Sequence, residues 1–134
     1  MPKKITPKLE ELDRFGKHAG LTYIKWGKGY SQCSLDVYDS LLNPYGTVHG
    51  GALFTMADSG MGFALVPTLE EGEQCASIEV SIVFLKAITS GTLICDTTVI
   101  KKSSKSAVLE SEIKNGGQLV AKALGTWVIY KKRD

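Results

Sequence analysis

The longest apolar stretch of the chain predicts a buried helix in its middle. From Gly50 to Val66 nearly every residue is apolar or very small, and no polar stripe runs along the segment. A helix that is apolar nearly all round is covered on its sides and does not lie on a surface. Pro67 disfavours the helical conformation of the residue before it, so we expect the helix to stop there.

The second half of the chain alternates polar and apolar residues at period two, which predicts antiparallel strands. The alternation is clearest in Ser77–Phe84 and indicates a strand with one buried face. Three more strands are expected, at Leu93–Lys101, Ser106–Lys114 and Leu119–Tyr130. Turns separate them, and Asn115-Gly116-Gly117 is a strong hairpin signal.

The first part of the chain is expected to form a short helix, a pair of strands and a loop. An amphipathic helix runs to Ala19, with Thr6 as its cap, Pro7 in its first turn and Gly20 at its end. A strand pair with a glycine turn follows, formed by Leu21–Trp26, Gly27-Lys28-Gly29 and Tyr30–Val37. Loops are expected at Asp39–Val48 and at the acidic segment Leu69–Gln74.

This order of elements predicts an α+β fold in which an antiparallel sheet wraps around one long central helix. The 134 residues fit a single domain over residues 1–134, with residues 1–20 as a helical lead-in. One sheet cannot cover a helix on every side. We therefore expect a second copy of the chain to cover the remaining side, which predicts a homodimer.

Composition and charge exclude several classes of protein. The hydrophobic fraction of 43% and the charged fraction of 22% are ordinary for a globular domain, and a formal net charge of +2 gives no reason to expect nucleic acid binding. The three cysteines and two histidines lack the spacing of a metal site or a disulfide framework. The N-terminus lacks the apolar core of a signal peptide, and no apolar run is long enough to span a membrane. We expect a cytoplasmic protein without a bound metal.

One acidic residue, Asp58, lies in the middle of the predicted apolar helix. Burying an unpaired carboxylate costs several kcal/mol or shifts its pKa, so a protein core keeps one only for a reason. The polar, glycine-rich run from Asn43 to Gly51 delivers His49 and two glycine amides to the start of the same helix, where negative charge is favoured. Together these groups indicate an acyl-transfer or hydrolysis site.

The same residues resemble the signature of the hotdog fold, and within it the PaaI-like acyl-CoA thioesterases of the phenylacetate pathway. The resemblance rests on Asn43-x-x-Gly46-x-x-His49-Gly50-Gly51 followed by Asp58, and it covers roughly residues 10–131. One departure is Lys86-Ala87-Ile88, where relatives often carry a proline. The resemblance implies a hydrolase of aryl- or medium-chain acyl-CoA thioesters, with no cofactor besides the coenzyme A of the substrate.

The resemblance also implies roles for five residues. Asp58 corresponds to the catalytic carboxylate, which acts either as the nucleophile or as the base for the attacking water. The backbone N–H of Gly50 corresponds to the group that holds the thioester carbonyl oxygen, with support from Asn43 and His49. Ser77, at the start of the third strand of the family, corresponds to a hydroxyl that places the water or the acyl group.

Further contacts with the substrate are expected from one glycine and three lysines. Gly51 has no side chain, so a substrate can approach its amide closely. Lys101, Lys102 and Lys105 flank a predicted turn and are candidate partners of the coenzyme A phosphates. A solvated hairpin is the alternative interpretation of these lysines.

The length of the helix predicts that the two reacting groups come from different subunits. Eight residues separate Gly50 from Asp58, which is about 12 Å of helical rise. One acyl carbon needs both groups within about 3–3.5 Å. Each site is therefore predicted to lie at the dimer interface, with Asp58 from one subunit and Gly50 from its partner, and we expect two dimers to pair into a tetramer.

Two other functions stay open from the sequence. Hotdog hydratases, which act on enoyl-CoA, place Asp, Asn-Pro and His close together, whereas Asp39, Asn43 and His49 are spread apart here. A non-catalytic acyl-CoA-binding protein is the other alternative, although Asp58 is retained. Structural interpretations also stay open for single residues, with Asn43 as a turn former and Ser77 as an ordinary strand residue.

Overall fold

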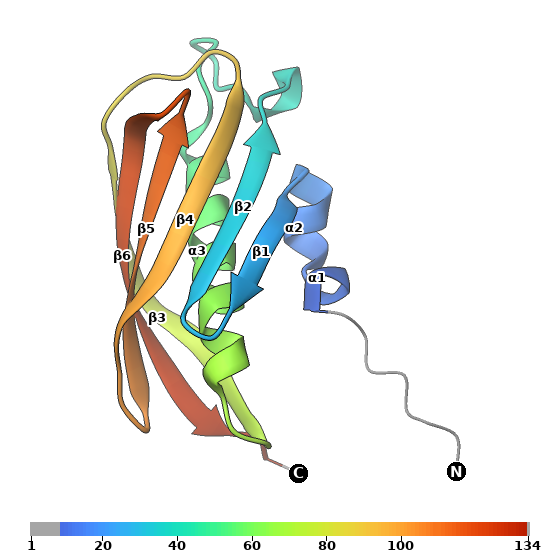
Figure 1. The fold of residues 1–134 in the computed structure, drawn as a ribbon. Helices are drawn as coiled ribbons and strands as arrows, with labels where there is room; N and C mark the ends of the chain where they lie inside the picture. The colour runs from blue at the N-terminus through green and yellow to red at the C-terminus, as the bar shows by residue number, and fades with distance from the viewer. Residues whose placement is uncertain (1–8, 134) are drawn as a thin grey trace.

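The computed structural model describes residues 9–133, which form one six-stranded antiparallel sheet with a long helix against one face (Figure 1). The strands are β1 (Thr22–Gly27), β2 (Tyr30–Asp36), β3 (Glu73–Phe84), β4 (Thr92–Lys102), β5 (Ser106–Asn115) and β6 (Gln118–Lys131). Their order in the sheet is β1-β2-β4-β5-β6-β3. The predicted α+β architecture with one long central helix is confirmed.

The helices lie where the sequence predicts them, and they differ from the prediction in one detail. They are α1 (Leu9–Leu12), α2 (Arg14–Ala19), α3 (Gly50–Leu65) and two 3₁₀ turns, η1 (Asp39–Leu41) and η2 (Val66–Thr68). α3 ends before Pro67, as predicted. The N-terminal helix is broken at Asp13, whose carboxylate caps α2 by accepting from the Gly16 amide, and Gly20 ends α2 with φ of 99°. The predicted Thr6 cap and Pro7 lie outside the described residues.

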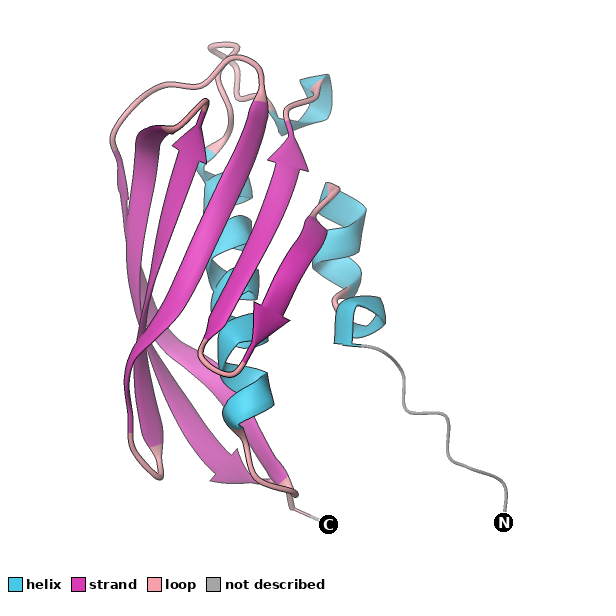
Figure 2. Cartoon of the chain, viewed as in Figure 1, coloured by secondary structure: helices cyan, strands magenta, loops and turns pink. Residues whose placement is uncertain are grey.

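None of the helices within residues 9–133 combines the length and the apolar composition of a membrane span. The longest, α3, has 16 residues. It packs against one face of the sheet, and no helix of the described residues covers the opposite face (Figure 2). α3 follows β2 in the chain and precedes β3, and these two strands lie far apart in the sheet order.

The strict alternation predicted for Ser77–Phe84 is wrong at Ile78. The pairing of β3 with β6 steps from Ser77 opposite Trp127 to Glu79 opposite Thr126, which leaves Ile78 as a β-bulge. Ile78 is 65% exposed, whereas Val80 and Ile82 pack on the core. The bulge changes which residues face the helix, so Ser77 shares the inner side with Val80.

β3 is the edge of the sheet, and this explains why its predicted buried face is only partly buried. Among the described residues it pairs with β6 on one side and with no strand on the other. Three of its large apolar side chains are more than half exposed: Phe84 on the predicted buried face, Ile78 at the bulge and Val83 on the opposite face. A long, apolar, unpaired edge is a surface onto which another strand can add.

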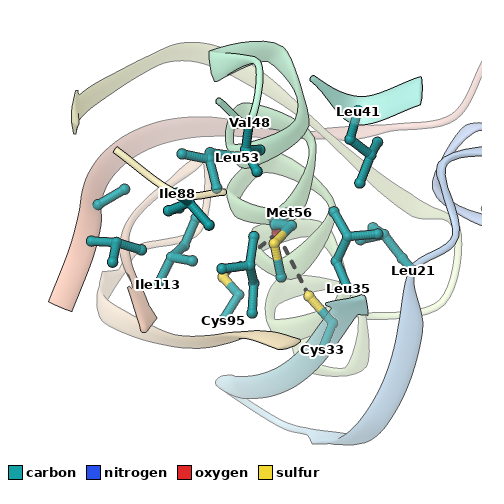
Figure 3. Close-up of a cluster of buried hydrophobic side chains, with 13 residues drawn as sticks. Leu21, Cys33, Leu35, Leu41, Val48, Leu53, Met56, Ile88, Cys95 and Ile113 are labelled. Atoms are coloured by element: carbon teal, nitrogen blue, oxygen red, sulfur yellow. Dashed lines mark hydrogen bonds between the residues drawn. The ribbon is translucent and has the colours of Figure 1, made fainter. Parts of the chain in front are cut away.

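The core lies between α3 and the sheet. One part gathers around Leu53 and Met56 of α3, and it includes Cys33 of β2 and Cys95 of β4 (Figure 3). The other part gathers around Met61 and includes Trp127 of β6. Both methionines are completely buried and fill the core.

Short polar side chains of the sheet form a buried polar cluster beneath α3, made of Ser31, Cys33, Cys95, Thr97 and Ser111. The Ser31 hydroxyl donates to the carbonyl oxygen of Gly60 at 2.6 Å. The thiols of Cys33 and Cys95 approach the carbonyl oxygen of Met56, at 3.9 and 3.7 Å respectively (Figure 3). The Ser111 hydroxyl lies 3.4 Å from the carbonyl oxygen of Ala57 and 2.7 Å from the Thr97 hydroxyl. These contacts hold one side of α3 against the sheet.

Two glycines of α3 are predicted to respond in opposite ways to alanine. A Cβ at Gly60 would come within 2.7 Å of the Thr97 hydroxyl oxygen, so Gly60→Ala is expected to destabilise the fold by about 1–3 kcal/mol. A Cβ at Gly62 would meet Trp127 at an ordinary 3.5 Å, so Gly62→Ala is expected to stabilise by about 0.5–1 kcal/mol. Urea unfolding of both variants measures this, and effects of the same sign would contradict the packing described here.

Candidate active site

Asp58 lies on the side of α3 that faces away from the buried polar cluster, and it is half-buried. Its Oδ1 atom is inaccessible to solvent and has no hydrogen-bond partner among the described residues. Burial raises the pKa of the Asp58 carboxyl, the Ser77 hydroxyl lowers it, and the negative charge of Asp13 raises it further. A carboxylate with an unpartnered oxygen and raised basicity is suited to take a proton from water.

Asp58 opens into a cavity of about 260 Å³, which we call the Asp58 pocket. Its polar lining comes from Asp58, Ser59 and Asp13. The remaining walls are apolar or small and come from α1, α3, η2 and β6: Leu9, Leu12, Gly62, Phe63, Val66 and Trp127. The pocket therefore combines an apolar interior with two carboxylates.

Asp13 and Tyr23 form a second polar pair beside Asp58 that the sequence did not indicate. The Tyr23 hydroxyl donates to Oδ2 of Asp13. The Tyr23 ring stacks on Phe63 of α3, with centroids 3.6 Å apart and an interplanar angle of 7°. Burial and the neighbouring Asp13 both raise the pKa of the Tyr23 hydroxyl, so the hydroxyl stays protonated as a donor. A bend between two short helices near the N-terminus gives no periodic signal that would have marked Asp13.

The start of α3 presents one free backbone donor. His49 caps the helix, and its Nδ1 atom accepts from the Gly51 amide at 2.8 Å. The amide of Gly50 has no acceptor among the described residues. A helix N-terminus carries a partial positive charge, so this amide is an available donor to an oxyanion. His49 itself is exposed, and its backbone amide donates to Leu41 at 2.8 Å.

Asn43 shapes the loop that leads to the helix. Its Oδ1 atom accepts from the amides of Tyr45 at 2.9 Å and Thr47 at 3.2 Å, and its Nδ2 atom donates to the Thr47 hydroxyl at 2.8 Å. Its backbone amide donates to the Thr47 carbonyl at 2.7 Å. These bonds make Asn43 the organiser of the turn that places His49 and Gly50.

A second cavity, of about 430 Å³, lies at this end of α3, and we call it the Gly50 pocket. Asn43 and Gly50 line it on one side, and Phe84 and Lys86 line it on the other. The Phe84 ring packs so closely over Gly50 that a Cβ there would lie 2.9 Å from the ring. Neither Phe84, which ends β3, nor Lys86, which follows it, was singled out as a site residue from the sequence, because their approach to Gly50 depends on how the end of β3 packs against α3.

The two cavities are separate within one chain. Asp58 lines the first and Gly50 the second, and no residue lines both. Ser77 is exposed on β3 and close enough to Asp58 to lower its pKa. Lys101, Lys102 and Lys105 are exposed around the β4–β5 turn and line neither pocket. The chain thus brings Ser77 to Asp58 and Asn43 to Gly50, and it leaves the lysines apart from both pairs.

No group of three or more His, Cys, Asp or Glu side chains within residues 9–133 is arranged to hold a metal ion. The chemistry that the described residues offer is a carboxylate of raised basicity, a nearby hydroxyl and a free helix N-terminal amide. When water attacks a carbonyl group, a carboxylate base can take its proton and an oxyanion donor can stabilise the negative charge on the carbonyl oxygen.

Comparisons with known proteins identify relatives across nearly the whole chain. A family profile described as "Thioesterase superfamily" matches residues 45–122. A protein of Saccharolobus solfataricus, named as a candidate esterase, is 32% identical over 95% of this chain and 83% of its own length. The acyl-coenzyme A thioesterase PaaI of Escherichia coli is 27% identical over 82% of this chain and 77% of its own length.

Solved structures share the fold. A conserved protein of Pseudomonas aeruginosa superposes with a TM-score of 0.87 at 30% identity, covering 92% of this chain and 100% of its own. A Streptococcus mutans protein bound to acetyl-CoA has a TM-score of 0.77 at 29% identity, covering 85% of this chain and 91% of its own. The sheet with one central helix matches these neighbours, which include PaaI of Thermus thermophilus, so the hotdog fold expected from the sequence is confirmed.

Asp58→Asn is predicted to stabilise the fold in a pH-dependent way. Because the folded-state pKa of Asp58 is raised above its unfolded value, the ionised carboxylate destabilises the fold, and the favourable contribution of the protonated form is lost as the pH rises through the folded pKa. The neutral amide is therefore expected to raise the melting temperature by a few degrees at pH 7–8 and to lose this advantage in acid, where Asp58 is itself protonated. Melting curves of the wild type and of Asp58→Asn, recorded from acid to pH 8, measure the difference in melting temperature. A variant that melts below the wild type at pH 8 would contradict the prediction.

Proposed function

Since the chain belongs to the thioesterase superfamily, we propose that it hydrolyses acyl-CoA thioesters, with Asp58 of one subunit and the Gly50 amide of its partner at each site. The observation that carries this proposal is the half-buried Asp58 carboxylate, which has an unpartnered oxygen and faces an otherwise largely apolar pocket. A purely structural carboxylate would have its buried oxygen satisfied.

Asp58 acts on the thioester carbonyl in one of two ways. As a general base it takes a proton from water, and the hydroxide attacks the carbonyl carbon. As a nucleophile it attacks the carbon itself, and water then cleaves the acyl–aspartyl anhydride. In both cases the C–S bond breaks, and the products are the free acid and coenzyme A with its thiol reprotonated. The Ser77 hydroxyl holds the water in this proposal, which its proximity to Asp58 supports.

The oxygen of the tetrahedral intermediate is held by the Gly50 amide at the N-terminus of α3. Gly50 is favoured over Gly51 for this role, because the Gly51 amide already donates to His49. His49 therefore acts by capping the helix and fixing the orientation of the neighbouring amide. Asn43 acts through the loop that it organises.

Two copies of the chain are needed to bring these groups together. The edge of β3 is long, apolar and free on one side, which supports pairing with the β3 edge of a second copy. A twofold axis at this edge makes the two α3 helices antiparallel, so the N-terminus of one lies toward the Asp58 half of the other. Each dimer then holds two sites, and pairs of dimers form the tetramer.

The coenzyme A moiety is proposed to bind along the Gly50 pocket. A neighbour that is 29% identical binds acetyl-CoA, which supports the same class of ligand here. Lys86 lines the Gly50 pocket, and its ammonium group donates to Gln118 at 2.7 Å. Lys101, Lys102 and Lys105 of the second subunit are the further candidates for the phosphates.

The acyl group is proposed to enter the Asp58 pocket. Phe63, Leu12 and Trp127 give it apolar walls. Stacking and burial against these side chains favour an aryl or a medium-length alkyl group. The thioester carbon then lies at the polar mouth of the pocket beside Asp58.

Replacing Asp58 is predicted to abolish hydrolysis without unfolding the protein. Asp58→Asn and Asp58→Ala are expected to lower kcat by roughly 10²–10⁴-fold in a thiol-release assay over a panel of acyl-CoAs, because the base or nucleophile is gone. Asp96→Asn removes a carboxylate from an exposed position on β4 and serves as the matched control, with activity near that of the wild type. Full thiol release by Asp58→Asn would remove the catalytic assignment.

The amide of Gly50 can be tested by removing its N–H with proline. Position 50 is the first residue of α3, where proline is tolerated, and His49 already has the extended conformation that a following proline requires, with φ of −61° and ψ of 135°. Because a side chain there meets Phe84, the variant is made as Gly50→Pro with Phe84→Ala, and Phe84→Ala alone is the control. The double variant is expected to lose about 10²–10³-fold in kcat relative to that control.

Mixing tests whether each site crosses the interface. Subunits that carry Gly50→Pro and Phe84→Ala are unfolded and refolded together with Asp58→Ala subunits. Half of the dimers are then mixed, and one of their two sites has an intact Asp58 and an intact Gly50. The mixture is expected to regain roughly a quarter of the control activity. A mixture as inactive as its parents would show that Asp58 and Gly50 act within one chain.

A further inference from the structure

Asp13 places a second carboxylate in the Asp58 pocket, at the bend between α1 and α2. Building on the proposed function, we propose that Asp13 is a specificity-determining residue: with the α1 wall it makes the pocket accept uncharged acyl groups and reject acyl groups that end in a carboxylate. The proposal narrows the substrate class to acyl-CoAs with an apolar, neutral tail.

The N-terminal segment closes the Asp58 pocket opposite α3. Leu9 and Leu12 of α1 line the pocket together with Phe63 of α3 and Val66 of η2. Leu12 is 54% exposed, so a bulkier side chain can be accommodated there without disturbing the core. The position of α1 therefore sets the space left for the tail of the acyl group.

Asp13 is held in a fixed position at this wall. Its Oδ1 atom accepts from the Gly16 amide at 3.2 Å and caps α2, and its Oδ2 atom accepts from the Tyr23 hydroxyl. Tyr23 is in turn stacked on Phe63. No Lys or Arg within residues 9–133 forms an ion pair with Asp13, so its charge is not neutralised by a neighbour.

The charge of Asp13 acts inside the pocket. Asp13 and Asp58 line the same pocket, and the negative charge of Asp13 is close enough to raise the pKa of Asp58. A carboxylate at the tip of an acyl group would be a third negative charge between apolar walls. At a separation of about 6 Å between Asp13 and that carboxylate, and an effective dielectric constant near 20, the repulsion lowers the binding affinity roughly 100-fold.

Two substrates of equal chain length test this directly. Hexanoyl-CoA ends in a methyl group, and adipoyl-CoA carries a carboxylate in its place. The wild type is expected to favour hexanoyl-CoA by at least about tenfold in kcat/KM. Asp13→Asn keeps one oxygen for the Gly16 amide and places its NH2 group beside the Tyr23 hydroxyl oxygen, which can accept from it. The variant loses the charge, so it is expected to reduce the preference by about tenfold.

Two control variants separate charge from structure. Asp13→Glu retains the charge and is expected to retain the preference for hexanoyl-CoA. Glu11→Gln removes a charge from an exposed residue of α1 that does not line the pocket, and it is expected to leave the ratio unchanged. A purely structural role of Asp13 would change the rates of both substrates alike and leave their ratio constant.

The α1 wall is tested with Leu12→Trp, which fills the pocket from that side. This variant is expected to lower kcat/KM for hexanoyl-CoA several-fold more than for acetyl-CoA. Phe15→Trp is the control, because Phe15 is 66% exposed on α2 and lies outside the pocket lining. Equal losses on both substrates would overturn the assignment of the wall.

The failures of this inference and of the proposed function are distinguishable. Hydrolysis of hexanoyl-CoA that depends on Asp58, with an unchanged substrate ratio in Asp13→Asn, overturns the inference alone. The absence of thiol release from every acyl-CoA tested with the wild type overturns the proposed function and this inference with it.

Discussion

The rotation of α3 about its own axis is the constraint on which the rest of the molecule depends. Because the helix is apolar nearly all round, hydrophobic burial alone does not decide which side faces the sheet. The buried polar cluster decides it, since its hydroxyls and thiols reach the carbonyl oxygens of Met56, Ala57 and Gly60. Any other rotation would leave these buried donors unsatisfied and would turn Asp58 into the core, where its charge has no partner.

With the rotation fixed, the positions of the polar groups of the site follow. Asp58 emerges on the far side of α3 and opens into an apolar pocket, while the free amide of Gly50 stays at the N-terminal end of the helix. A rigid helix cannot bring these two groups together. In the proposed dimer, a second copy of the chain pairs at the open edge of β3 and brings the two groups together, which links the sheet topology to the proposed chemistry.

The elements that could be predicted are those whose signals are local. The extent of α3 follows from its composition and from Pro67, and the burial of Asp58 follows from the residues around it. The predictions failed where the structure depends on the register between strands or on contacts between elements that are distant in the sequence. Period two could not reveal the bulge at Ile78, because one extra residue in β3 depends on its pairing with β6. Asp13 reaches the site only through the packing of α1 and α2 against α3, which no spacing in the sequence encodes.

The site trades stability for reactivity at one carboxylate. Desolvation makes the ionised form of Asp58 unfavourable, and the negative charge of Asp13 adds to that effect. The same two influences make the carboxylate a stronger base, because both raise the free energy of the ionised form relative to the protonated one. The Ser77 hydroxyl opposes them and helps to keep the acid ionised, as the proposed catalysis requires. In the proposed function the second carboxylate of the pocket also disfavours anionic ligands, so one arrangement of charges would adjust both the basicity of Asp58 and the choice of acyl group.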